Sequence, residues 1–366
     1  MTAGFYSPLP PAPSGVADYA AALLEELRRH GRVKVAPRRC DVALCHLGNN
    51  ALHAAAYRRA LESPSVVVLH DAVLNHFLLG QLGEEAYVEE FVYNYGEWHR
   101  ALARDLWRAR AGSGADSRYF RYPMLRRAVE SARAVVVHNP AAAQALHRHA
   151  PKARIVEIPH LFRAPAPPGD VETARYRQAL GVAPDTFLFG VFGYLRESKR
   201  LTTVLEVFAQ VRREIPRAAL LVAGRFVSSD LERAVAGLVA ECGAIRRPFL
   251  SDHDFWLAAR AVDACINLRY PAAGETSGIA IRLMGIGKPV VVTDSLEYQR
   301  FPEGACLRVP PGPAERDSLR AHVVLLSSVF GAAAAIGQRG AGHIAACHGV
   351  EQAGKRYWEL LCECCS

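Results

Sequence analysis

A carboxylate, a glycine and a run of aliphatic residues stand close together in the segment 274–292, which reads Gly-Glu-Thr-Ser-Gly-Ile-Ala-Ile-Arg-Leu-Met-Gly-Ile-Gly-Lys-Pro-Val-Val-Val. The pattern predicts a loop, a short helix, a tight glycine turn and a buried strand. Glu275 can accept hydrogen bonds from sugar hydroxyls, and Gly278 lets the free N–H groups of the helix start approach a phosphate. An ordinary helix cap would explain Glu275 and Ser277, but not the Gly-Lys-Pro entry into the strand. We therefore expect a sugar diphosphate site here.

A second candidate is the loop 192–201, Phe-Gly-Tyr-Leu-Arg-Glu-Ser-Lys-Arg-Leu, which follows a predicted strand and precedes a predicted helix. Arg196 and Lys199 are close enough to point at one diphosphate and to stabilise the charge that develops as a sugar leaves it. Considered alone, the loop also fits a solvated charge cluster, but the strand–loop–helix context favours an anion site. Because these cations would take the place of a metal ion, we expect a metal-independent site.

The first half of the chain contains a third loop, 7–19, which has four prolines and leads into a helix predicted over 20–29. Gly15 stands where the loop meets the helix and can bring backbone N–H groups close to a phosphate, although a plain proline-rich helix entry explains it too. His70 and Asp71 end another predicted strand, and open α/β sheets bind their ligands at this end of their strands. A lone histidine in such a place is more often structural, so its role stays open at this point.

Two other polar motifs have simpler explanations. Asp252-His253-Asp254 is similar to a metal-binding pair of carboxylates, but it directly precedes a helix predicted over 255–261 and fits a helix cap better. The clustered cysteines near the end of the chain, Cys362, Cys364 and Cys365, have a spacing that matches no standard zinc site. We therefore predict no metal site.

The net charge of +8 is spread unevenly, because nine arginines lie between Arg100 and Arg133, beside Trp98 and Trp107. Such a basic and aromatic stretch fits an anionic membrane surface, and a solvated helix face over buried rings would explain it as well. We expect peripheral contact with an anionic membrane and no nucleic-acid partner.

Apolar β-branched runs alternate with helical patterns along the chain, which is typical of parallel βαβ units. These runs predict strands over 33–36, 42–46, 65–70, 134–138, 155–158, 187–192, 219–222, 264–268, 289–293 and 305–309. The 366 residues exceed what one hydrophobic core usually serves, and three prolines within 165–168 exclude regular structure there. We expect an N-terminal domain over 1–163, a linker over 164–170, a C-terminal domain over 171–348 and a final helical segment over 349–366.

The segments 7–19, 48–71, 193–200 and 269–292 together resemble the retaining glycosyltransferases of family 4, which are also called glycosyltransferase group 1. The resemblance covers nearly the whole chain. It implies the α/β fold named GT-B, in which two Rossmann-like domains with parallel sheets face each other across a central cleft. It also implies that the N-terminal domain binds the acceptor, that the C-terminal domain binds the nucleotide sugar, and that the last helix packs back on the N-terminal domain.

The same resemblance implies roles for individual residues. Glu275 would bind the transferred sugar and His70 would face it at the reaction centre, so these two are the catalytic candidates. The donor-binding candidates are Gly15, Arg196, Lys199, Thr276, Ser277, Gly278, Ile279 and Arg282. The family's second glutamate, which usually holds the ribose, is absent. Arg282 stands in its place, where it would contact phosphate or pair on the surface.

The sequence as a whole predicts a metal-independent, retaining glycosyltransferase that needs no cofactor. It would move a hexose from a nucleotide diphosphate sugar to a glycan or lipid-linked acceptor, as in polysaccharide biosynthesis. The chain starts without a basic flank or an apolar stretch, which predicts a cytoplasmic protein that makes peripheral contact at the inner membrane face. The missing glutamate leaves one alternative open, a non-catalytic GT-B module that binds sugar nucleotides. A second alternative is a sugar-nucleotide epimerase of the same fold.

Overall fold

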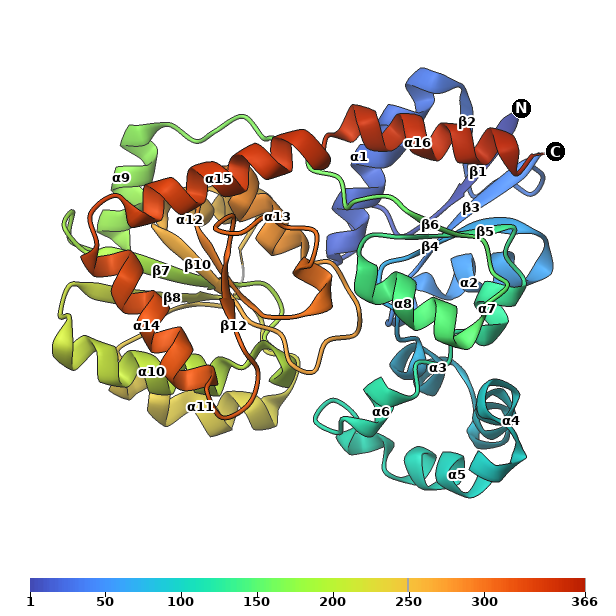
Figure 1. Ribbon diagram of the computed structural model, residues 1–366, viewed down its shortest axis with the longest axis horizontal. Coiled ribbons are helices and arrows are strands. Elements are labelled where there is room, and N and C mark those ends of the chain that lie inside the picture. Colours follow the sequence, from blue (N-terminus) through green and yellow to red (C-terminus); the bar gives the residue numbers. More distant parts are fainter. Residues whose placement is uncertain (249, 366) are drawn as a thin grey trace.

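Two parallel β-sheets of six strands each form the framework of the computed structural model, which describes residues 1–248 and 250–365 (Figure 1). The first sheet contains β1 (Thr2–Tyr6), β2 (Arg32–Val35), β3 (Val42–Leu47), β4 (Ser65–Leu69), β5 (Ala134–Val137) and β6 (Ile155–Glu157). The second contains β7 (Phe187–Phe192), β8 (Ala218–Ala223), β9 (Ile245–Arg247), β10 (Ala264–Asn267), β11 (Val290–Thr293) and β12 (Leu307–Val309). Residues 163–169 connect the two sheets without helix or strand.

The strand order shows where each sheet changes direction. It is β2-β1-β3-β4-β5-β6 in the first sheet and β12-β11-β10-β7-β8-β9 in the second. The direction of the connections therefore reverses between β1 and β3, and between β7 and β10. Open α/β sheets bind ligands beyond the carboxyl ends of the strands at such points. The loops after these four strands are thus the first places to look for a site.

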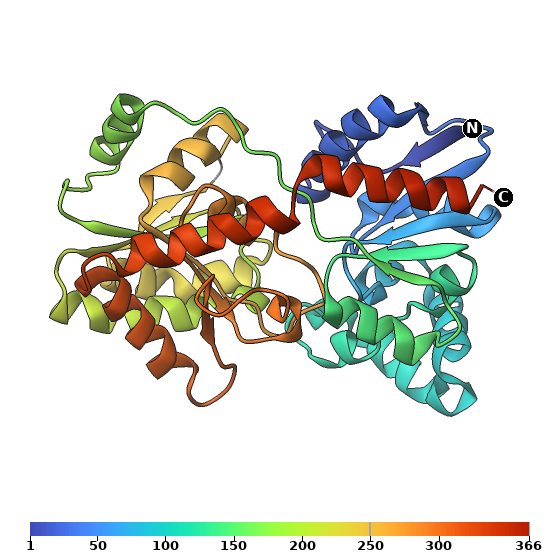
Figure 2. The same cartoon turned by 45° about the horizontal axis from the view of Figure 1, so that its top comes forward.

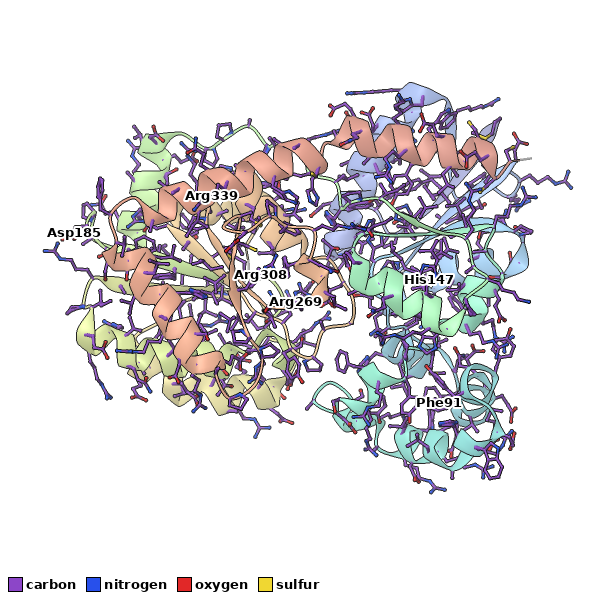
Figure 3. The ribbon with its side chains drawn as sticks, viewed as in Figure 1. Phe91, His147, Asp185, Arg269, Arg308 and Arg339 are labelled. Atoms are coloured by element: carbon purple, nitrogen blue, oxygen red, sulfur yellow. The ribbon has the colours of Figure 1, made fainter. Side chains whose placement is uncertain are left out.

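Both faces of each sheet are covered by helices, because successive strand residues point to opposite sides. In β3, Leu44 and Cys45 belong to different buried clusters, and in β7 Leu188 and Phe189 do the same. The N-terminal helices are α1 (Gly15–His30), α2 (Ala54–Glu62), α3 (Asn75–Gln81), α4 (Glu84–Tyr95), α5 (Arg100–Arg108), α6 (Arg118–Arg121), α7 (Arg126–Glu130) and α8 (Pro140–His149). Helices α4 to α6 extend below the sheet in Figure 1, and Phe91 of α4, labelled in Figure 3, joins the same buried cluster as β-strand residues such as Val67.

The last two helices run across both lobes (Figures 1 and 2). The C-terminal helices are α9 (Asp170–Ala179), α10 (Leu201–Glu214), α11 (Ser229–Glu241), α12 (Asp252–Ala261), α13 (Gly278–Gly285), α14 (Glu315–Ser328), α15 (Ala332–Cys347) and α16 (Val350–Glu363). Helix α15 packs on α13, whereas α16 packs on α1, where the hydroxyls of Tyr19 and Tyr357 lie 2.9 Å apart. A Cβ at Gly354 would lie 2.3 Å from Cγ of Glu26, so glycine permits the close approach of α16 to α1.

The α/β fold class with two parallel sheets is confirmed, while some element boundaries were wrong. Helix α1 begins at Gly15 rather than at residue 20, because Ser14 caps it by accepting from the N–H of Val16. Helix α12 likewise begins at Asp252, capped by Ser251. Strands β1 and β9 were not predicted; β1 precedes a proline-rich loop, and the Ile-Arg-Arg of β9 has no apolar alternation.

Among the described residues, no single helix is both long and apolar enough to cross a bilayer. Helices α14 and α15 meet that criterion only as a pair, and the pair is bent by 105°.

Candidate active site at the domain junction

The carboxyl edges of the two sheets meet at the junction of the domains, where hydrogen bonds fix one edge to the other. The N–H of Ala72, after β4, donates to the carbonyl of Ala273 at 2.7 Å. Asn139, after β5, donates from Nδ2 to the carbonyl of Gly274 and to Oγ1 of Thr276, both at 2.9 Å. Gly274 has a φ of +69°, and a Cβ there would lie 2.7 Å from that of Ala72. The loop between β10 and α13 is therefore docked on the N-terminal domain through a glycine.

Glu275 lies in that loop and both of its carboxylate oxygens have partners. One accepts from the N–H of Ala273 at 2.7 Å, and the other forms an ion pair with Arg269, which follows β10 and faces the N-terminal domain (Figure 3). Arg269 also reaches Oγ of Ser277 at 3.4 Å, and Ser277 caps α13 by accepting from the N–H of Ala280. The Nε–H of Arg269 is buried and has no acceptor among the described residues. This side of the junction can therefore donate to an anionic or hydroxyl-bearing ligand.

The loop after β7 adds two cations to the same side. Lys199 is buried in the 3₁₀ turn η4 (Glu197–Lys199), and its Nζ donates to a backbone carbonyl of β7. Burial, followed by the positive charges of Arg269 and Arg196, lowers the pKa of this amine to about 7. Gly193 turns with a φ of +85°, and a Cβ there would lie 3.4 Å from Nζ of Lys199 and 3.7 Å from the side chain of Ile279. A bound anion would favour the charged form of Lys199.

The proline-rich loop of the N-terminal domain closes over this region. The hydroxyl of Tyr194, next to Gly193, donates to the carbonyl of Pro13 at 2.9 Å. Apart from its neighbours in the helix, no atom of the described residues lies within 4 Å of the Cβ position of Gly15, the first residue of α1. This side of the first turn of α1 is therefore open, and the N–H of Val16 there is bonded to Oγ of Ser14. Gly278 at the start of α13 lies near His160 of the N-terminal half. The distance from the Cβ position of Gly278 to Nε2 of His160 is 3.7 Å.

Arg282 bridges the junction, because its guanidinium contacts side chains of both domains. Its guanidinium pairs with Asp18 in the first turn of α1 at 2.8 Å, and it lies 5.5 Å from the ring of Phe255 and 5.8 Å from that of Trp256. The resemblance placed Arg282 where a carboxylate usually stands. A carboxylate is present here after all, and α1 of the other domain supplies it.

His70 belongs to a buried aromatic cluster at the carboxyl edge of the first sheet. The other members are Tyr19, His46, His53, His138 and His160. Nε2 of His70 lies 2.9 Å from Nδ1 of His46, and its ring meets that of Tyr19 edge-on, with the centroids 4.9 Å apart. Burial holds the pKa of His70 well below its ordinary value, so the imidazole is neutral at pH 7. It can exchange hydrogen bonds with a hydroxyl but brings no charge to the junction.

Three polar residues at the junction were not among the site candidates taken from the sequence: Asp18, Asn139 and Arg269. Two of them stand two residues after a strand, namely Asn139 after β5 and Arg269 after β10. The rule that ligands bind at carboxyl ends of parallel strands, which pointed to Asp71, would have selected these two as well. Asp18 lies on a helix and has no such signal.

Asp252 and Asp254 lie away from this site, as part of a helix cap. Ser251 accepts from the N–H of Asp254 at 3.1 Å, and its hydroxyl lies 2.7 Å from the carboxylate of the same residue. The described residues contain no group of three or more His, Cys, Asp or Glu side chains arranged to hold a metal ion.

The basic stretch 100–133 reaches the site where the Cβ position of Gly114 lies 3.7 Å from Oε2 of Glu197 in η4, and ion pairs neutralise much of the stretch. The pairs are Arg100 with Glu89 and Glu97, Arg118 with Asp116, Arg126 with Glu130, and Arg127 with Glu90. Three of these acidic partners precede the stretch in the sequence. Trp98 is 97% exposed, whereas Trp107 is half-buried and lies under Arg110. Less positive charge is free here than the sequence suggested.

Several solved structures share this architecture over nearly the whole chain. HepE from Anabaena, in complex with UDP and glucose, matches 99% of this chain and 100% of its own at 15% identity, with a TM-score of 0.71. Sucrose-phosphate synthase from Thermosynechococcus elongatus matches over 98% of each chain at 18% identity, with a TM-score of 0.68. The chain has the GT-B fold. WaaG, a glycosyltransferase involved in lipopolysaccharide biosynthesis, matches over 99% of each chain at 15% identity, with a TM-score of 0.63.

No family model matches the chain, and neither does any curated protein.

Proposed function

We propose that the protein is a glycosyltransferase that moves a hexose, with retention of configuration, from a nucleotide diphosphate sugar to a glycan or lipid-linked acceptor. The observation that carries this proposal is the pairing of Glu275 with Arg269 beside the start of α13, next to Lys199 and across from α1. A carboxylate for sugar hydroxyls stands here beside cations and helix N-termini for a diphosphate. Proteins of the same fold add support, since HepE has been crystallised with UDP and with UDP-glucose.

In this proposal each group acts at a stated part of the donor. The carboxylate of Glu275 accepts hydrogen bonds from the sugar, with Thr276 in the same loop. Lys199, Arg196 and the N–H groups at the starts of α1 and α13 hold the diphosphate and stabilise the charge that forms when its bond to the sugar breaks. His70 faces the sugar as a neutral imidazole. These assignments extend to Gly15, Ser277, Gly278 and Ile279 as parts of the donor site.

No metal ion or other cofactor is part of this proposal, since two cations and two helix starts supply positive charge to the diphosphate. Activity should therefore survive EDTA. A loss that manganese or magnesium restores would contradict this part and would turn attention to Asp252 and Asp254.

The first experiment is a screen of UDP-, GDP- and ADP-sugars for thermal stabilisation of the purified chain, followed by turnover of the best binder. A ligand at about 100 times its Kd stabilises by about 2.7 kcal/mol, which a melting curve resolves. Sugar transfer or donor hydrolysis supports the proposal. Tight binding without turnover would favour the non-catalytic module, and conversion of one sugar nucleotide into another without acceptor would favour the epimerase.

A cytoplasmic location and peripheral contact with an anionic membrane remain predictions. The exposed Trp98 supports membrane contact, and the ion pairs within 89–133 weaken it. Cosedimentation with anionic and neutral vesicles, at low and high salt, tests the contact. Equal binding to both vesicle types would contradict it.

A further inference from the structure

Asp71 places a second carboxylate at the junction, on the N-terminal side opposite Glu275. It follows His70 at the end of β4, and its Oδ2 accepts from the N–H of Asn49 at 2.7 Å. Asn49 is itself fixed, because its Oδ1 accepts from the N–H of Phe77 at 2.8 Å. The other oxygen of Asp71, Oδ1, receives no hydrogen bond from the described residues. One oxygen thus anchors the group and the other is available.

A glycine lets the loop after β3 close over this carboxylate. A Cβ at Gly48 would lie 3.1 Å from Oδ2 of Asp71 and 2.7 Å from Nε2 of His53. His53 donates from Nδ1 to the carbonyl of His46 at 2.9 Å, and burial lowers its pKa. Its Nε2 therefore carries no proton, and the neutral ring does not compensate the charge of Asp71.

Charged groups of the C-terminal domain lie close enough to Asp71 to act on its pKa. The charges of Glu275, Arg196 and Arg269 all act on its carboxyl group. An interdomain hydrogen bond joins Ala72, the residue after Asp71, to Ala273, which stands two residues before Glu275. This bond fixes the position of one carboxylate relative to the other. A sugar bound at Glu275 would lie in the same charged environment as Asp71.

We propose that Asp71 is the residue that binds the attacking hydroxyl of the acceptor and takes its proton, an inference that rests on the proposed glycosyl transfer. The acceptor oxygen forms a bond to the anomeric carbon, and the bond from that carbon to the diphosphate oxygen breaks. The electron pair of the broken bond stays on the diphosphate, and the hydroxyl proton passes to Oδ1 of Asp71. Glu275 is poorly placed for this role because both of its oxygens already have partners.

The surroundings of Asp71 suit a proton acceptor at neutral pH. Burial, followed by the negative charge of Glu275, raises the pKa of Asp71 to about 6, against the lowering effects of the Asn49 N–H and of Arg196 and Arg269. The carboxyl group is then mostly ionised at pH 7 and still basic enough to take a proton. Because the ionised form is the active one, kcat/KM should fall as the pH falls through about 6. A separate decline at higher pH follows from the loss of the proton of Lys199, whose pKa is about 7.

The test compares Asp71→Asn, Asp71→Glu and the wild-type chain, using the sugar nucleotide that stabilises the wild type most, with water and free glucose as acceptors. Asp71→Asn should lower kcat by about 10²–10⁴-fold, which is the usual contribution of a general base. It should also remove the acidic limb of the pH profile, while binding of the nucleoside diphosphate changes little. Asp71→Glu should have a higher kcat than Asp71→Asn and should again show the acidic limb of the pH profile. Asp105→Asn, which removes an exposed carboxylate of α5, is the matched control and should behave as wild type.

Three outcomes would overturn the inference. If Asp71→Asn keeps most of the wild-type rate, the proton passes elsewhere, as to the leaving diphosphate. If the rate falls but the acidic limb stays, or if nucleotide binding is lost with the rate, Asp71 has only a structural role. If the wild type turns over no sugar nucleotide at all, the proposed function fails and the inference fails with it.

Discussion

The carboxyl edges of the two sheets have the same topology and opposite chemistry. The edge of the first sheet carries buried imidazoles, including His46, His70 and His138, whose pKa values are all lowered by burial. The edge of the second sheet carries Arg269 with its partner Glu275, and Lys199 close by. Polar groups at a buried junction must either lose their charge or find a partner of opposite charge. The histidines at the edge of the first sheet lose their charge, whereas the charged groups at the edge of the second sheet are mainly paired.

This difference fits two tasks in the proposed reaction. A diphosphate carries negative charge, so the edge that would hold it needs cations kept in place by buried partners. A hydroxyl acceptor is neutral, and neutral imidazoles can exchange hydrogen bonds with it without strongly attracting the donor's charge. Asp71 is the charged exception on the first edge, and charges of the second domain act on it.

The largest effect is expected from removing the carboxylate of Glu275 at the carboxyl edge of the second sheet. Glu275→Ala should abolish transfer, by about 10³-fold or more, while the nucleoside diphosphate still binds, because the carboxylate would contact the sugar and not the phosphates. Glu275→Gln is the control for folding, since an amide oxygen can still accept from the N–H of Ala273. Steady-state rates and calorimetric titration with UDP measure the two effects. Unchanged turnover in Glu275→Gln would contradict the role given to the charge.

The two edges also differ in how far the sequence reveals them. On the second edge, Glu275 to Arg282 and Gly193 to Lys199 form two short segments, so their residue types and spacing could be interpreted together. On the first edge, the cluster draws single residues from positions between 19 and 160, and no local spacing marks it. Only the position at the end of a predicted strand pointed to His70 and Asp71, and strand pairing was not yet known.

The partner of Arg282 shows the same limit across domains. The sequence showed that the usual carboxylate was missing at this position in the C-terminal half. It could not show that Asp18 on α1 brings one to the same place, because that depends on how the two lobes meet. Contacts within a segment were predictable, whereas contacts between lobes were not.

The second prediction tests whether the imidazoles of the first edge stay neutral. Burial lowers the pKa of His138 to about 4, as it does for His348 at the crossing into α16. In the unfolded chain these groups bind protons below about pH 6.5, while in the folded chain they do so only near pH 4. The unfolded state therefore gains protons first, and the free energy of unfolding falls as the pH drops from 6.5 towards 4. Each such group contributes a slope of up to about 1.4 kcal/mol per pH unit.

Urea unfolding at several pH values measures this slope. His138→Asn should make it smaller, and His147→Asn, which changes an exposed histidine of α8 labelled in Figure 3, should leave it unchanged. An equal slope in wild type and His138→Asn would show that His138 is not the buried neutral group described above.

The smallest expected effect concerns the pair that joins the two edges, Asp18 with Arg282. Both side chains are partly exposed, at 48% and 24%, so their coupling in a double-mutant cycle of unfolding should be only about 0.2–1 kcal/mol and should weaken with salt.

The cycle also separates two roles for Arg282. If it binds the donor phosphate, Arg282→Ala should weaken UDP binding in both the presence and the absence of Asp18, whereas Asp18→Ala alone should free the guanidinium and strengthen binding. If the pair acts only as an interdomain contact, both single variants should change UDP affinity to the same small extent, and the double variant should add nothing further. Titration of UDP into the four chains at two salt concentrations decides between these results.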